Sequence, residues 1–170
     1  GQDNSSQGFR DNFNEIKTNF TEAKSEIEDL QTNKANLNAS SDFTNNELTR
    51  AKLKNNSETV YAHGSVSSGS VTLNHGNGHY QTLTITADTT FAFTNFPSGA
   101  LGRIILDITV APTSTGILTF PSAVIKADNV TGNDGTSDQM TIGLGRALFE
   151  FMSPDGGTTI LMHQIGKQYV

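Results

Sequence analysis

The sequence predicts an α+β protein that is mainly β, with an N-terminal coiled-coil helical stem followed by an antiparallel β-sandwich or jelly-roll-like body. The first observation is the uneven distribution of charged residues: 16 of the first 57 residues are charged, compared with 12 of the remaining 113. The second observation is the distribution of turn-forming residues. Fourteen of the 16 glycines and all four prolines fall in the second part, where short strands need turns. We therefore expect a helical stem at 1–57 and an antiparallel β domain at 58–170.

Apolar residues in the stem recur at alternating spacings of four and three, and then at a spacing of seven across the polar Lys34. Ser5 and Ser6 are candidate N-caps just before the repeat begins. A repeat of about 3.5 residues keeps a narrow stripe facing a supercoiled partner, and is too thin for a helix lying on a globular core. We expect a coiled coil over about 7–37, with oligomerisation contacts from Phe9, Phe13, Ile16, Phe20, Ala23, Ile27, Leu30 and Leu37.

The partner expected for this seam is other copies of the same helix. Bulky Phe13 and Phe20 would crowd a two-stranded seam, which favours a homotrimer. Strand edges in the body would also need neighbours to cover them. The alternative is a helical pair folded against the β body within one chain, for which a strict seam is the less natural pattern.

The seam breaks at residues 38–43, which carry turn chemistry. Thr44 and Glu47 then have the spacing of a capping box, and this pattern predicts a second short helix at about 45–54. Leu48, Ala51 and Leu53 would form its buried side. We expect this segment to act as a shoulder between the stem and the body.

Aliphatic or aromatic residues recur at every second position along several short stretches of the body, most clearly at 82–86, 90–94 and 104–110, and threonine is frequent at the positions between them. Period-two alternation predicts half-buried antiparallel strands. A strong turn from Ser153 to Gly157 is expected to join the last two strands as a hairpin. The inward residues are expected to be Leu83, Ile85, Phe91, Phe93, Ile104, Leu106, Ile108, Phe149, Phe151 and Ile160.

Two sets of motifs carry a family resemblance. A short polar start leads into Phe9-Arg10-Asp11-x-Phe13-x-x-Ile16-x-x-Asn19-Phe20. This run resembles the opening segment of many tailed-bacteriophage fibre and appendage proteins. The second set lies between Tyr80 and Gly166 and comprises Gln81-Thr82-Leu83-Thr84, Thr90-Phe91-Ala92-Phe93-Thr94-Asn95-Phe96-Pro97, Leu118-Thr119-Phe120-Pro121-Ser122-Ala123-Val124 and Phe149-Glu150-Phe151-x-Ser153-Pro154-Asp155-Gly156-Gly157-Thr158-Thr159. These motifs are similar to a β module that recurs in phage virion proteins.

The resemblance implies a structural protein of the phage particle, without enzymatic activity or cofactor. We expect a trimeric tail, neck or head fibre that binds other virion proteins through its N-terminal stem and exposes its β domain, with a host-surface receptor as a candidate partner. A capsid-decorating trimer is one alternative. The other is a host-glycan-binding or glycan-cleaving module, although the chain has no Trp to form an aromatic sugar platform.

The composition and the spacing of candidate site residues argue against several other classes of protein. The net charge of −6 argues against a protein that coats nucleic acid. No apolar run approaches the about 20 residues that span a bilayer, and the N-terminus lacks the basic-then-apolar order of a signal peptide. No nucleophile, base and orienting group can be placed together, and Asp107 and Glu150 are expected to face outward by alternation. We assign no metal site. The weak candidates are a histidine set and a calcium-like loop: His63, His75 and His79, and Asp128, Asn129, Asn133, Asp134 and Asp138.

Overall fold

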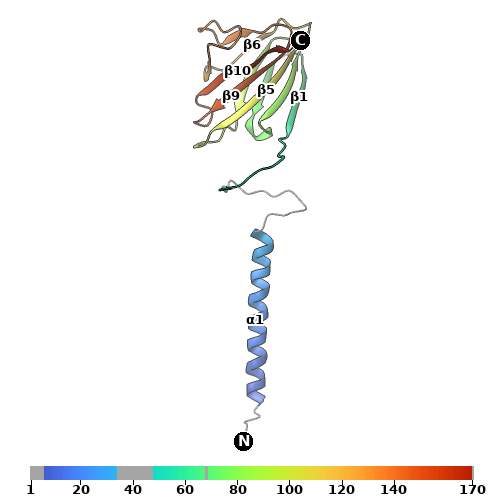
Figure 1. Ribbon diagram of the computed structural model, residues 1–170, viewed down its shortest axis with the longest axis vertical. Helices are drawn as coiled ribbons and strands as arrows, with labels where there is room; N and C mark the ends of the chain where they lie inside the picture. Colours follow the sequence, from blue (N-terminus) through green and yellow to red (C-terminus); the bar gives the residue numbers. More distant parts are fainter. Residues whose placement is uncertain (1–5, 34–47, 68, 170) are drawn as a thin grey trace. The chain divides into compact units, whose positions relative to one another are not determined.

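The computed structural model describes residues 6–33, 48–67 and 69–169. The chain divides into two compact units, Gly1–Leu53 and Lys54–Val170. One N-terminal helix and a body of ten strands make it an α+β protein that is mainly β, as the sequence predicts (Figure 1).

The helix α1 spans Ser6–Asn33 and is about 42 Å long at about 1.5 Å per residue. Its whole described surface is exposed. Thr18 and Thr21 donate side-chain hydrogen bonds to carbonyls one turn earlier, and Lys24 pairs with Glu28 at 3.6 Å. No helix within the described ranges is both long enough and apolar enough to cross a membrane.

The second short helix expected at 45–54 is absent from residues 48–54, which form a turn and extended chain. Arg50 and Asn55 have φ angles of 58° and 57°, in the left-handed region that ends helices. The capping pattern at Thr44 and Glu47 lies outside the described residues. The expected burial of Leu48 and Leu53 is wrong, because their side chains are 58% and 72% exposed, and Ala51 is exposed as well.

Ten strands form the body. They are β1 Val60–Val66, β2 Ser70–Asn74, β3 Tyr80–Ile85, β4 Thr89–Thr94, β5 Gly102–Val110, β6 Ile117–Thr119, β7 Val124–Lys126, β8 Gln139–Thr141, β9 Gly145–Ser153 and β10 Ile160–Tyr169. A six-stranded sheet, called sheet A, has the order β1-β3-β5-β9-β10-β7, and Figure 1 labels its strands β1, β5, β9 and β10, with β3 lying between β1 and β5. A four-stranded sheet, called sheet B, has the order β2-β4-β6-β8.

The expectation of antiparallel strands is wrong for the first half of the body. Strands β1 to β6 alternate between the two sheets, and β1 to β4 each pair in parallel with the strand two places later, so that Val60 lies beside Tyr80 and Tyr80 beside Ile105. The chain therefore winds as a two-layered coil. Antiparallel pairing appears only where β9 joins β5 and β10, and where β8 joins β6.

Sequence alternation cannot distinguish the two arrangements, because a strand in such a coil also has one face on the core and one in solvent. Each crossover between parallel neighbours contains a strand of the other sheet, which supplies the length that a parallel connection requires. The expected hairpin between the last two strands is present, since β9 and β10 pair antiparallel around the turn after Ser153.

Both sheets contribute to one hydrophobic core. Phe93 of β4 packs on Phe151 of β9 with ring centroids 4.9 Å apart, and Phe120 lies 5.8 Å from Phe151. All the expected inward residues belong to this core, with Phe93 partly buried at its edge. The core fixes which face of sheet A points outward, and that face carries the polar site described next.

Candidate functional site

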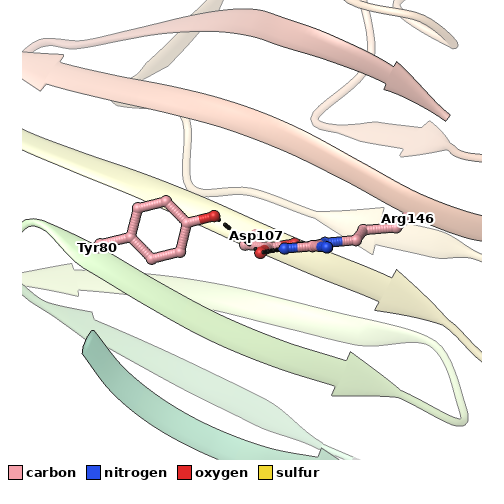
Figure 2. A network of polar contacts seen from close by, with 3 residues as sticks. All are labelled: Tyr80, Asp107 and Arg146. Carbon is pink, nitrogen blue, oxygen red and sulfur yellow. Dashed lines mark hydrogen bonds and ion pairs between the residues drawn. The ribbon is translucent and has the colours of Figure 1, made fainter. Parts of the chain in front are cut away.

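Three polar side chains converge on the outer face of sheet A from the neighbouring strands β3, β5 and β9 (Figure 2). Arg146 Nε donates to Asp107 Oδ1 at 2.6 Å, and Arg146 Nη2 donates to Asp107 Oδ2. Tyr80 donates its hydroxyl proton to Asp107 Oδ2 at 2.8 Å. The carboxylate thus accepts three hydrogen bonds, two of them from one guanidinium in a fork geometry.

Asp107 occupies the outward position that alternation predicts, yet only 4% of its side chain is exposed because its two partners cover it. The hydrogen bonds from Arg146 lower the pKa of Asp107, and the one from Tyr80 acts in the same direction. Burial, followed by the bond to Asp107, raises the pKa of Tyr80.

These properties suit a fixed electrostatic clamp. A general acid or base works best with a pKa near the operating pH, whereas Asp107 is held as a carboxylate. The side chain of Arg146 is still 52% exposed, so its guanidinium presents a polar surface beside the clamp. The three side chains can therefore keep the carboxylate charged and fixed in position on this face, and the exposed guanidinium can contact another polar molecule there.

A shallow depression of about 310 Å³ lies beside this clamp. Most of its lining residues are small or carry a hydroxyl group, and Leu83, Asp107 and Arg146 line it as well. Strands β1, β3, β5 and β9 supply the lining, which includes Ala62, Gly64, Thr82, Thr84 and Thr109. The depression offers hydroxyl groups and one guanidinium, which are donors and acceptors for a polar ligand.

A second charged pair lies on the same face. Arg103 Nε is 3.2 Å from Glu150 Oε1, which links β5 to β9. Glu150 was expected to face outward, and it does, but its side chain is only 20% exposed. His163 lies opposite Glu150 in the register of β10 with β9 and is half-buried.

The three histidines that the sequence analysis names only as a weak metal candidate do not come together as a set. His63 Nε2 lies 2.8 Å from Gln81 Oε1, while the rings of His75 and His79 lie 5.3 Å apart near the short helix η1, His75–Asn77. Burial and the neighbouring His79 lower the pKa of His75. Among the described residues, no group of three or more His, Cys, Asp or Glu side chains is placed to hold a metal ion.

The calcium-like loop uses its side chains to shape its own turns. Asp134 Oδ1 accepts the backbone N–H groups of Thr136 at 3.0 Å and Ser137 at 2.7 Å. Asn133 Oδ1 accepts from Gly135 N at 3.0 Å, and Asn129 donates to the carbonyl of Gln164 at 3.2 Å. This is the ordinary turn chemistry of Asn and Asp.

The expected oligomerisation residues from Phe9 to Leu30 all lie on α1, and Leu37 lies outside the described residues. Phe13 is 67% and Phe20 is 74% exposed. Tyr80 and Arg146 were not anticipated as site residues, because recognising them requires knowing that β3, β5 and β9 are neighbours. No family model matches the chain, and neither a curated protein nor a solved structure gives a significant match to it.

Proposed function

We propose that the chain is a structural protein of a tailed-phage particle, namely a trimeric tail, neck or head fibre attached through its N-terminal helix with the β domain exposed. The observation that carries the proposal is the exposed apolar seam of α1. Six large side chains on a single helix, Phe9, Phe13, Ile16, Phe20, Ile27 and Leu30, are between 48% and 74% exposed. The resemblance of the Phe9–Phe20 run to phage fibre openings supports the same assignment.

The seam needs a partner because large exposed apolar surfaces are rare on proteins that remain monomeric. Burying one such side chain fully contributes about 1.5–3 kcal/mol, so several per chain would stabilise a coiled coil that an isolated helix could not maintain alone. Three strands fit the paired phenylalanines at position a better than two. The seam residues from Phe9 to Leu30 all lie within one continuous helix, Ser6–Asn33.

Light scattering of the purified full chain tests the trimer. We expect three times the chain mass of 18.2 kDa. The double variant Ile27→Asp/Leu30→Asp should be a monomer, because a charge in the seam would be desolvated without a partner. Its matched control is Ser25→Asp/Thr32→Asp, which changes the side of the helix opposite the seam and should remain trimeric. A wild-type monomer at micromolar concentration would contradict the proposal.

Attachment is tested on particles. A chain lacking residues 1–20 should keep its folded β body and fail to join the particle, whereas Ser25→Asp in the full chain should be incorporated normally. A particle map that shows the β body against the shell and the helix in solvent would favour the capsid-decoration alternative instead.

The depression beside Asp107 and Arg146 favours one second candidate, a host-glycan-binding module. Its lining of threonine hydroxyls with one guanidinium matches the hydrogen-bonding groups of a sugar. Titrating host-surface polysaccharide fragments into ¹⁵N-labelled protein should then shift the amide signals of Thr82, Thr84 and Thr109 selectively. The variant Thr109→Val should weaken that binding, and Thr72→Val on sheet B should not.

A further inference from the structure

The outer face of sheet A carries large apolar side chains that the single chain leaves open. Val60 is 58%, Ile125 55% and Leu161 37% exposed. Strand register places Val60 in one row with Tyr80 and Ile105, and Ile125 in another with Leu161 and Met152, all on this face. Tyr80, Ile105, Leu148 and Met152 are half-buried there. The face is therefore apolar at both of its lateral edges, with the polar clamp between them.

The charged groups of this face neutralise one another. Arg103 pairs with Glu150, and Arg146 pairs with Asp107, so two positive and two negative charges are matched within the face. The net charge of the whole chain is −6, which makes copies repel one another in general. Among the described side chains, a copy that approaches this face meets no uncompensated carboxylate, and Asp107 is already removed from water, so docking would desolvate mainly the half-exposed guanidinium groups of Arg103 and Arg146.

The outer face of sheet B provides an internal comparison. Its exposed side chains are small or uncharged polar groups: Ser70, Thr72, Thr90, Ala92, Thr94, Gln139 and Thr141. No exposed charge or exposed large aliphatic side chain lies on the described strands of that face, where Ile117 of β6 is half-buried. The two outer faces of one body thus differ in the way that a covered face differs from a solvent-facing one.

We propose that the outer faces of sheet A from the three chains meet one another in the trimer, and that the outer face of sheet B is the one presented to solvent. This inference rests on the proposed homotrimer. Association of the stems would hold the bodies at a local concentration in roughly the millimolar range, so the contact between faces need not be strong by itself.

The absence of cysteine from the chain allows a direct test. Ala62 is exposed in β1 on the outer face of sheet A, opposite Thr82 in the register, and Ala92 is exposed in β4 on the outer face of sheet B. Ala62→Cys and Ala92→Cys are therefore matched single-thiol variants of the full chain. We expect maleimide to label the thiol at position 62 at least about tenfold more slowly than that at position 92.

Two further variants identify the source of that protection. In the Ile27→Asp/Leu30→Asp monomer, the thiol at position 62 should react as fast as that at position 92. In the trimer, adding Leu161→Asp on the same face should restore fast labelling at position 62, and Thr72→Asp on sheet B should leave it slow. Protection that survives both changes would come from the chain itself and would overturn the proposal.

The failure of this inference is distinct from failure of the proposed function. Equal labelling of the two thiols in a chain that light scattering shows to be a trimer would overturn the face contact and leave the trimer standing, with sheet A open for the glycan alternative. A wild-type monomer would overturn the homotrimer and this inference together.

Discussion

Arg146 holds Asp107 from the neighbouring strand by two hydrogen bonds to the two carboxylate oxygens, although the two residues are not directly opposite each other. In the register of β5 with β9, Asp107 lies beside Leu148 and Arg146 beside Thr109. The guanidinium therefore reaches diagonally across the ladder. This diagonal contact, with Tyr80 on the other side, removes the carboxylate from water on a face where alternation alone would leave it solvated.

Replacing Asp107 by Asn should lower the free energy of unfolding by about 1–3 kcal/mol, because hydrogen bonds to a charged acceptor are stronger than those to an amide. The substitution keeps the shape of the side chain and removes only its charge. The matched control is Asp138→Asn, which changes an exposed carboxylate and should have an effect within about 0.5 kcal/mol of zero. Urea denaturation of both variants measures the difference.

The contribution of Asp107 should depend on pH in a defined direction. Its pKa in the folded chain is lowered from the ordinary 3.8, so its stabilising effect is complete above that value and is lost as pH falls through the lowered folded pKa. The stability difference between wild type and Asp107→Asn should be constant from about pH 5 to pH 7 and shrink below about pH 4. A difference that grows on acidification would contradict the clamp.

Gly116→Ala should cost more than about 1 kcal/mol of stability. Gly116 has a φ of +72°, and an added Cβ would collide with the carbonyl oxygen of Ile142. Gly99→Ala is the matched control, because Gly99 has a φ of +75° with open space where the Cβ would lie. Thermal unfolding should show a clearly larger loss at position 116. Equal losses would mean that strain at φ dominates and the close approach contributes nothing.

His63 should carry its proton on Nε2. Gln81 is fully buried and donates both of its amide hydrogens, to the carbonyls of Asn74 at 2.8 Å and Gly78 at 3.0 Å. Its Oε1 is therefore an acceptor, and His63 Nε2 must donate to it. The ¹⁵N shifts of the imidazole ring at neutral pH will show which nitrogen is protonated. A proton found only on Nδ1 would contradict this network.

Gln81→Leu tests the same buried network through stability. It would leave two carbonyl groups without their side-chain donor, and we expect a loss of about 1–3 kcal/mol for each group that water cannot reach. Thr82→Val is its neighbouring control on the outer face, where solvent can hydrate any group left unpaired. Denaturant unfolding that finds Gln81→Leu neutral would show that the network contributes no net stability.

The alternation of residues predicted well which side chains of a strand point into the core, but it did not predict which strands pair with each other. Alternation placed Phe149 and Phe151 in the core and Asp107 on the opposite face of the sheet. The pairing of Val60 with Tyr80 was not predictable, because a turn between two strands of different sheets has the same glycine-rich signature as a hairpin. The candidate site depends on that pairing pattern, since its three residues come from strands that are distant in sequence. The capping pattern at Thr44 likewise gave no information on the left-handed Arg50 that follows.

The winding order of the body also determines how it would respond to mechanical load. Strand β1 is both the first strand after the stem and an edge strand of sheet A, bonded only to β3, and β2 is likewise an edge strand of sheet B. Tension transmitted along the chain from the stem therefore reaches the outermost turn first. The coil would unfold one turn at a time, first β1 with β2 and then β3 with β4. The antiparallel block of β5, β9 and β10 would unfold last. A body pulled from the stem would therefore lengthen in steps, one turn of the coil at a time.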